Sequence, residues 1–339
     1  MSRGRLRVAV IQGGPSSEAE VSRASASGVA KALTASGHDV VRLELDGFLA
    51  ETLRTGGFDV VFPVVHGAVG EDGSLQGLLE VLALPYVGSG VLPSAMAMNK
   101  AVARRLFAAE GIPIAPGFSA HREATPAAEV AARALRELPT GLVVKPAESG
   151  SAIGIGRFPS RPSAEGLEAA IAQAYALGAE VVVEAFVPGR EVTCGVLEIM
   201  DAAPGVATAL PPTEIRAPKD AFYTFQARYA PGRSEHLCPA ELGPFGARVQ
   251  ALAVRAHRAL ACRDLSRVDF VVGDREADVV VLEVNTLPGL TPTSLLPEEA
   301  AAAGLDFGAF CTRLVVRATE RGPTRRNAAL PFPGAPTAV

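Results

Sequence analysis

Cysteines are few and scattered in this sequence. Only four of its 339 residues are cysteines, and no two of them form a C-x-x-C pair; they are Cys194, Cys238, Cys262 and Cys311. A disulfide framework or a metal–thiolate cluster needs cysteines at close, regular separations, so this spacing argues against both. Free thiols persist in reducing compartments, and we therefore expect the protein in the cytoplasm.

Long apolar runs and clusters of basic residues are missing as well. The first apolar run ends after Ile11, which is too short for the core of a secretory signal, and no run approaches the roughly 18 apolar residues that a membrane helix needs. The net charge is −4, and no run of Lys or Arg stands out in the folded part. We expect neither a membrane nor a nucleic acid as a partner.

The composition is that of a folded soluble protein, because 48% of the residues are hydrophobic and 20% are charged. The length is sufficient for two or three domains. The exception is the segment from Glu320 to the end, which is rich in Pro, Gly and Arg. We expect this tail to be disordered.

The N-terminal part alternates between strand-like and helix-like segments. Strands are expected at Leu6–Ile11, Val40–Leu45 and Asp59–Val65, with a helix at Glu18–Thr34 that Ser17 would cap. This order predicts an open parallel sheet, in which ligands bind at the carboxyl ends of the strands. The block from about Ser89 to Val187 predicts a small α+β unit, and a further helix is expected at Pro244–Ala261. The segments of this block are the helices Asn99–Glu110 and Ser163–Leu177 and the strands Leu142–Lys145 and Ala179–Phe186. The last of these strands is expected to pair with Glu191–Leu197 around Pro188-Gly189.

Two strand-like runs near the C-terminal end predict a β-hairpin, because the polar turn 273–278 separates them. The runs are Arg267–Val272 and Val279–Val284. On neighbouring strands Asp269 can face Glu283 and Asn285. Oxygen ligands of this kind suit Mg²⁺, which usually also takes water and substrate phosphates.

Arg267 adds a cation to this hairpin. It lies two residues before Asp269, so both side chains point to the same side of the strand. A cation beside a metal site suits phosphoryl chemistry, because charge builds up on the transferring oxygens. A sheet edge with solvated charges remains the alternative interpretation.

The strand ending at Lys145 leads into a glycine-rich loop, 146–156, whose amides can close over a phosphate. The loop does not have the GxxxxGK[ST] spacing, which excludes a P-loop. Farther along, Glu184 and Glu191 can offer a strand end to a base edge and a carboxylate to a ribose. An ordinary glycine-rich turn and a solvated pair of glutamates are the alternatives.

Two loops are expected at the carboxyl end of the N-terminal sheet, and they contain Glu18 and His66. Glu18 would suit an ammonium group, although a carboxylate near a helix start is also stabilised by the helix dipole alone. His66 is either a ligand or a structural histidine. The segment Phe222–Tyr229 mixes aromatic residues with one cation and predicts a lid that excludes water from a reactive intermediate. Core aromatic residues on a strand are the alternative.

Six segments, which follow one another in one order from about Leu6 to Leu314, resemble the D-alanine–D-alanine ligase family. The runs HGAVGEDGSLQG at His66–Gly77 and RVDF…LEVNTLPG at Arg267–Gly289 resemble the two signatures of this family. The remaining four segments are Gly13–Ser22, Val144–Ile155, Phe222–Tyr229 and Thr291–Pro297. Departures from the usual family pattern lie at Asn99, Ala152, Thr224, Phe225, Arg228 and Asp264, the last at a position where glycine is common.

The resemblance implies an α/β protein in which an ATP-grasp fold follows an N-terminal open parallel-sheet domain. The implied division is 1–88 for the substrate-binding domain, 89–187 for the central subdomain, 188–319 for the subdomain with metal site and lid, and 320–339 for the tail. The implied reaction joins two D-alanines with ATP through an acyl phosphate, for peptidoglycan precursor synthesis. D-alanine and ATP would be the small-molecule partners, and the chain would form a homodimer.

The resemblance also implies roles for individual residues. Those that would hold ATP are Lys100, Lys145, Ser151, Glu184, Phe186, Val187, Glu191, Phe222 and Leu282. Those that would carry two Mg²⁺ ions, or Mn²⁺ in their place, are Asp269, Glu283 and Asn285. Those that would bind D-alanine are Glu18 and His66 for the first molecule, and Arg228, Ser294 and Leu295 for the second. Arg267 and the Gly289 amide would stabilise the oxyanion, and Ser151 and Tyr229 would link to Glu18 and order the lid.

Two other functions remain open. A relative that joins D-alanine to D-lactate or D-serine would share the same blocks, although Tyr229 and Leu295 favour the dipeptide. A non-catalytic nucleotide-binding protein with the ATP-grasp fold is the second alternative. The presence of Asp269, Glu283 and Arg267 argues against that alternative, since loss of any of them would have indicated lost turnover.

Overall fold

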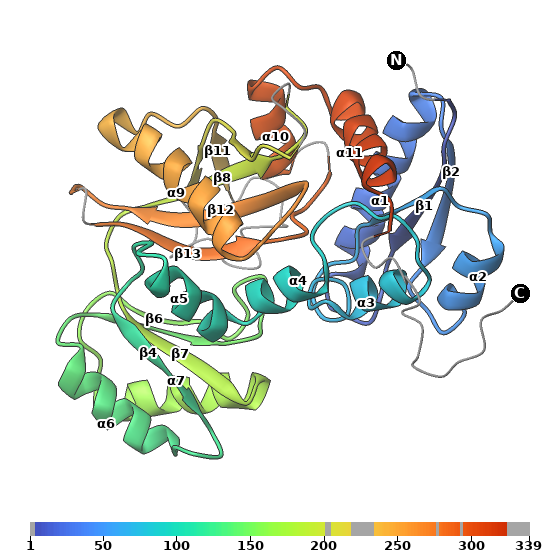
Figure 1. Cartoon of the computed structure of the whole chain (residues 1–339). Coiled ribbons are helices and arrows are strands. Elements are labelled where there is room, and N and C mark those ends of the chain that lie inside the picture. Colours follow the sequence, from blue (N-terminus) through green and yellow to red (C-terminus); the bar gives the residue numbers. More distant parts are fainter. Residues whose placement is uncertain (1–3, 201–204, 218–233, 276–277, 292–293, 324–339) are drawn as a thin grey trace, which may run out of the picture.

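The computed structural model describes residues 4–200, 205–217, 234–275, 278–291 and 294–323, which form three β-sheets with helices packed against them (Figure 1). The sheets follow one another along the chain. None of the described helices is long and apolar enough to cross a membrane.

The first sheet is parallel and has the strand order β2-β1-β3. Its strands are β1 (Arg7–Gln12), β2 (Asp39–Glu44) and β3 (Val60–Pro63), with α1 (Ala19–Ala35) and α2 (Leu49–Thr55) as the connections. The predicted open parallel sheet is confirmed. The predicted helix cap is wrong, because the N-cap residue of α1 is Glu18 and not Ser17.

Three helices lead from this sheet to the second one, namely α3 (Ser74–Val81), α4 (Val91–Met98) and α5 (Lys100–Ala109). Asn99 caps α5, since its side-chain oxygen accepts a hydrogen bond from the Val102 amide at 3.0 Å. Such a cap satisfies one of the free amides of the first turn. It also fixes the start of the helix at Lys100, a residue to which the resemblance assigns a phosphate contact.

The second sheet is antiparallel and has the order β4-β7-β5-β6. Side chains alternate across β7, as they do in any strand. Val181 and Val183 face a core that includes residues of α6 and α7, whereas Val182 packs with Ala101 of α5. The elements are β4 (Gly117–His121), α6 (Ala127–Glu137), β5 (Leu142–Pro146), β6 (Gly156–Phe158), α7 (Ala164–Leu177) and β7 (Glu180–Ala185).

The predicted pairing of the strands on either side of Pro188-Gly189 is wrong. The first of them, β7, pairs with β4 and β5, whereas the second, β8 (Arg190–Leu197), belongs to the third sheet. The reason is that β8 pairs with β12 along its whole length and is buried from Val192 onward. This long-range pairing outweighs the proximity of β7 in the sequence, so residues 186–189 connect two sheets instead of closing a hairpin.

The third sheet is antiparallel and has the order β11-β10-β8-β12-β13, with β9 also paired to β8. Cys194 on one face of β8 belongs to the core under α9, and Gly195 on the other face is close to Leu296 of α10. The elements are β9 (Thr208–Ala209), β10 (Thr213–Arg216), β11 (Glu235–Leu237), the short 3₁₀ helix η1 (Gly243–Phe245), α9 (Gly246–Ala259), β12 (Leu265–Val272), β13 (Val279–Asn285) and α10 (Leu295–Ala302). The predicted hairpin and the predicted helix before it are therefore confirmed.

The last helix, α11 (Phe307–Arg321), returns to the first sheet and packs beside α1 (Figure 1). Phe310 and Leu314 of α11 share one core with Val29 of α1 and Phe62 of β3. The division into residues 1–88, 89–187 and 188–319 follows the three sheets and stays a prediction. The predicted tail lies outside the described residues from residue 324 onward.

Asp264 ties these parts together. Its side chain is fully buried and accepts hydrogen bonds from the Gly88 amide at 2.8 Å and from the Arg321 guanidinium at 2.5 and 3.0 Å. Asp264 has φ = 62°, in the left-handed region that glycine adopts most easily. The carboxylate thus connects Gly88, which follows the first sheet, with the start of β12 and with the end of α11. These contacts hold a residue whose backbone conformation is strained.

Candidate active site

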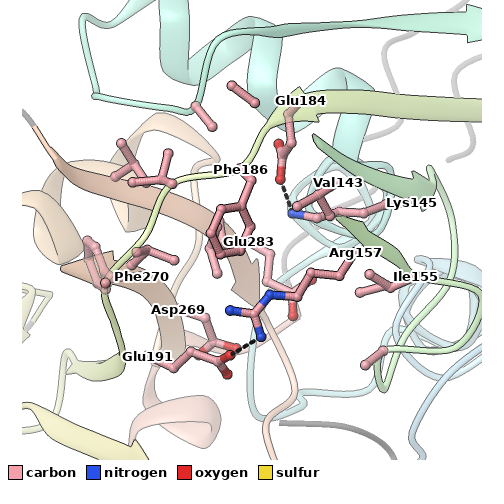
Figure 2. A pocket seen from close by; sticks show the side chains of 18 of the residues that line it. Val143, Lys145, Ile155, Arg157, Glu184, Phe186, Glu191, Asp269, Phe270 and Glu283 are labelled. Atoms are coloured by element: carbon pink, nitrogen blue, oxygen red, sulfur yellow. Dashed lines mark ion pairs between the residues drawn. The ribbon is translucent and has the colours of Figure 1, made fainter. Parts of the chain in front are cut away.

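A first cavity, of about 130 Å³, lies between the second and third sheets (Figure 2). Apolar side chains such as Phe186 and Leu282 line it together with charged ones. All the predicted nucleotide-site residues that the structure describes, except Ser151, line this cavity, and so do two of the predicted metal ligands. These lining residues are Lys100, Lys145, Glu184, Phe186, Val187, Glu191, Leu282, Asp269 and Glu283.

The pairing of β5 with β7 positions Lys145 against Glu184. Val143 pairs with Glu184 and Lys145 pairs with Val182, so Lys145 and Glu184 are diagonal neighbours on one face of the sheet. The Lys145 Nζ atom forms an ion pair with the Glu184 Oε1 atom, and both side chains are almost fully buried (Figure 2). A buried carboxylate needs such a partner.

Glu191 lies on the opposite side of this cavity, beside Arg157 of β6. The Arg157 Nη1 atom is 4.0 Å from the Glu191 Oε1 atom, and the guanidinium carbon lies 4.9 Å from the centre of the Phe186 ring (Figure 2). The sequence analysis missed Arg157. Its place in the short segment directly after the glycine-rich loop was an available signal, but the pairing with Glu191 joins residues of two sheets.

Asp269 lies at the centre of the hairpin, paired with Glu283. Its Oδ1 atom accepts hydrogen bonds from Thr193 Oγ1 at 2.7 Å and Arg267 Nε at 2.9 Å. Its Oδ2 atom accepts from Arg267 Nη2 at 2.8 Å and Asn285 Nδ2 at 3.2 Å. The prediction that Arg267, Asp269, Glu283 and Asn285 come together is therefore confirmed as geometry.

The donor set of this hairpin fits Mg²⁺. Two carboxylates and one amide oxygen are hard ligands, and they leave room for phosphate and water in the coordination shell. Cations balance both carboxylates, since Arg267 bonds Asp269 and the Lys100 Nζ atom lies 3.2 Å from the Glu283 Oε2 atom. No group of three or more His, Cys, Asp and Glu side chains is arranged to hold a metal ion in the described part of the chain, and the hairpin itself offers two carboxylates and an amide.

A second cavity, of about 470 Å³, adjoins the hairpin at Arg267, whose side chain lies on the same face of β12 as Asp269. Asp269 and Glu283 line the first cavity, whereas Arg267 and Asn285 line the second. The second cavity brings together every described residue to which the family resemblance assigns contact with D-alanine, stabilisation of the oxyanion or the link between the glycine-rich loop and Glu18. These are Glu18, His66, Ser151, Arg267, Gly289, Ser294 and Leu295.

A hydrogen bond at this cavity joins two loops that are distant in the sequence. The Ser151 hydroxyl of the glycine-rich loop donates to the Glu18 Oε1 atom at 2.5 Å, and Glu18 is only 7% exposed. Ser151 and Ala152 have φ values of 50° and 58°, in a region that L-residues rarely adopt. Such strain persists where neighbouring contacts impose it, and the bond to Glu18 is one of those contacts.

His66 lies beside Glu71 in the same cavity. The His66 Nδ1 atom is 4.0 Å from the Glu71 Oε1 atom, and the other carboxylate oxygen of Glu71 accepts a hydrogen bond from the Gly67 amide at 2.7 Å. The His66 Nε2 atom is buried and has no hydrogen-bond partner within the part of the chain that the structure describes. A buried polar atom of this kind is rare unless a ligand or water bonds it.

The N-terminus of α10 faces the second cavity. Ser294 is its N-cap residue, but the Ser294 side chain makes no cap bond to the helix and instead accepts a hydrogen bond from the Thr291 amide at 3.1 Å. Ser294 therefore leaves the first-turn amides of α10 without a cap from its own side chain, and such a helix start attracts carboxylates. Gly289 lies close by, since a Cβ atom there would come within 3.1 Å of the Ser294 hydroxyl.

Glu299 is a buried acid below this site that the sequence analysis missed. It is fully buried and accepts a hydrogen bond from the Gly195 amide at 2.6 Å, opposite Arg267 in the β8–β12 register. Burial away from water raises the pKa of Glu299 to about 8. No sequence signal separates it from its neighbour Glu298, which is half-buried beside His236, because Glu299 is buried only through the packing of α10 against β8.

Three of the predicted site residues lie outside the described residues. They are Phe222, Arg228 and Tyr229, and the whole predicted lid segment lies there with them.

The architecture is that of an ATP-grasp protein, with the candidate nucleotide cavity between two antiparallel sheets and an open parallel sheet before them. Solved structures agree with this description. The D-alanine–D-alanine ligase of Bacillus anthracis complexed with ATP has a TM-score of 0.76 at 28% identity and covers 93% of this chain and 98% of its own. The ligase of Coxiella burnetii has a TM-score of 0.78 at 27% identity, with 94% of each chain covered.

Sequence comparisons identify the family. The family models described as D-ala D-ala ligase N-terminus and C-terminus match residues 48–89 and 106–316. Proteins named D-alanine–D-alanine ligase from Acidiphilium cryptum and Granulibacter bethesdensis are 44% and 42% identical, over 93% of this chain and 99% and 98% of their own length. The chain belongs to the D-alanine–D-alanine ligase family.

Proposed function

We propose that this protein is an ATP-dependent ligase that joins two D-alanines to D-alanyl-D-alanine, for peptidoglycan precursor synthesis. The observation that carries the proposal is that neighbouring residues on one face of the hairpin line both cavities. Asp269 and Glu283 face the candidate nucleotide cavity, and Arg267 and Asn285 face the candidate amino-acid cavity. A phosphoryl group in one cavity and a carboxylate in the other can therefore meet beside Arg267.

In the first step the carboxylate of the first D-alanine attacks the γ-phosphate of ATP, the bond between the γ-phosphate and ADP breaks, and an acyl phosphate and ADP are formed. Lys100 and Lys145 lie where they would hold the phosphates, and Glu18 would hold the ammonium group of the amino acid. Asp269, Glu283 and Asn285 would hold Mg²⁺, which supplies charge neutralisation for the transferring phosphoryl group when it is bound.

In the second step the amine of the second D-alanine attacks the acyl phosphate carbonyl, and phosphate leaves. Arg267 and the Gly289 amide would stabilise the negative charge on the carbonyl oxygen. Ser294 and the start of α10 would hold the carboxylate of the attacking D-alanine. The bond between Ser151 and Glu18 would keep water out while the acyl phosphate exists. Arg228 and Tyr229 stay assigned to the second carboxylate and to lid ordering as predictions.

The proposal includes a homodimer, which the family resemblance implies, and a cytoplasmic location, which the scattered cysteines favour. Sedimentation of the purified protein checks the dimer.

Phosphate release with ATP and Mg²⁺, in the presence of single amino acids, tests the function directly. The expected result is release that depends on D-alanine and not on L-alanine, with D-alanyl-D-alanine detected by mass spectrometry. Better turnover of D-lactate than of D-alanine as second substrate near neutral pH would favour a depsipeptide ligase. Pure, folded protein that releases no phosphate with D-alanine would contradict the proposal and favour a nucleotide-binding protein.

A further inference from the structure

Arg104 lies behind the candidate nucleotide cavity and has no role in the function described so far. It belongs to α5, four residues after Lys100 and therefore on the same side of the helix. Its Nη1 atom donates a hydrogen bond to the Glu184 Oε2 atom at 2.6 Å, and its Nη2 atom donates to the Ala115 carbonyl at 2.8 Å. Both partners line the cavity, while Arg104 does not.

These contacts place the Glu184 carboxylate between two cations. Lys145 bonds one of its oxygens and Arg104 bonds the other. The side chains of Lys145 and Arg104 are each 11% exposed and that of Glu184 is 5% exposed, so water screens these charges weakly. One carboxylate cannot neutralise two cations, and the group keeps one net positive charge at the cavity wall, where a triphosphate would bind.

Without Arg104 the same carboxylate would face Lys145 alone. The pair would then be neutral, and Glu184 would be free to draw the ammonium group back from the cavity. The Arg104 guanidinium also fixes the relative positions of α5, β7 and the segment around Ala115, because its planar group donates two hydrogen bonds in different directions. The single ammonium group of a lysine cannot reproduce this pair of bonds.

We infer that Arg104 is a positioning residue of the nucleotide site, which holds Glu184 from behind so that Lys145 presents its charge to the ATP phosphates. The inference deepens the proposed function and rests on the assignment of the first cavity to ATP. Arg104 itself lines neither of the two cavities.

The neighbouring Arg105 provides a matched control. It lies on the same helix, is exposed, and its guanidinium Nε atom donates a hydrogen bond to the Ala101 carbonyl within that helix. Arg105→Met removes the same charge from the same element without disturbing Glu184. A difference between Arg104→Met and Arg105→Met therefore reports the contact with Glu184 and not the loss of a positive charge in general.

The experiment measures ATP binding by calorimetry without D-alanine, and then KM for ATP and for D-alanine. Arg104→Met should raise the Kd and KM for ATP by roughly 10-fold, because one charge of a buried ion pair is lost, and should leave KM for D-alanine within about twofold. Arg105→Met should change neither. Arg104→Lys should recover part of the ATP affinity, and in the Glu184→Gln background Arg104→Met should cost less than in the wild type.

An ATP affinity of Arg104→Met within about twofold of wild type would overturn the inference, and so would equal rises in both KM values. If Arg104→Met does not fold, Arg104→Lys decides the matter, since an unchanged KM for ATP in that variant also overturns the inference. Wild-type protein that binds ATP but releases no phosphate with D-alanine would contradict the proposed function alone. The calorimetric test of Arg104 would remain valid in that case.

Discussion

Replacement of Ser151 by Ala tests whether the bond between the glycine-rich loop and Glu18 assembles the site. The bond is 2.5 Å long and joins a hydroxyl to a carboxylate that is 7% exposed. Hydrogen bonds to charged groups contribute about 1.5–3 kcal/mol, which corresponds to roughly 10–100-fold in a rate or an equilibrium. Ser151 also has φ = 50°, so the loop should leave this conformation more often once the bond is lost.

The assay is kcat/KM for D-alanine at saturating ATP, together with amide hydrogen exchange in residues 148–154. Ser151→Ala should lower kcat/KM by the stated factor and speed up exchange in this loop. Ser149→Ala is the matched control, because the Ser149 hydroxyl donates to backbone carbonyls of the same loop, at 3.1 Å to Ile153. Equal effects of the two changes, or a fall of less than about threefold for Ser151→Ala, would refute the reasoning.

Three further changes test other parts of the structure. Arg267→Ala should lower kcat by about 10²–10³-fold through loss of an oxyanion donor, whereas Arg275→Ala, at an exposed arginine in the turn of the same hairpin, should be nearly neutral in the same steady-state assay. Asp264→Ala should lower the free energy of unfolding in urea by about 3–5 kcal/mol, because it leaves the Arg321 guanidinium without its buried carboxylate; a loss below about 1 kcal/mol would contradict that account. Burial raises the pKa of Glu299 from 4.5 to about 8, so the folded state binds the proton more tightly than the unfolded state and stability should fall as pH rises through this window. Glu299→Gln should flatten that decline in urea melts at several pH values, and an unchanged slope would argue against the burial effect.

Much of the fold could be predicted from the sequence because the local patterns agree with the long-range packing. The hairpin is the clearest case, since a two-residue alternation places Arg267 and Asp269 on one side and a polar turn brings Glu283 opposite Asp269. Local sequence patterns could not exclude the predicted pairing of β7 with β8. That pairing does not form because β8 pairs over its whole length with β12, about 70 residues later in the sequence.

The missed residues share one property, which is that their partners lie on other elements. Arg104 of α5 meets Glu184 of β7, and Glu299 of α10 is buried against β8. Helical periodicity shows which face of a helix is apolar, but it does not show which charged residue meets a buried carboxylate across a sheet. The departure at Asp264 was visible in the sequence, yet its bond to Arg321 depends on the return of α11 to the first sheet.

Crystals grown with ATP and Mn²⁺ provide the most direct test of the central claim, because the anomalous signal of manganese locates the metal independently of the protein. The account predicts metal peaks within about 2.0–2.4 Å of oxygens of Asp269, Glu283 and Asn285, with the triphosphate in the cavity beside Lys100 and Lys145. Bound nucleotide without metal at these three side chains, or metal and nucleotide at another surface, would contradict it.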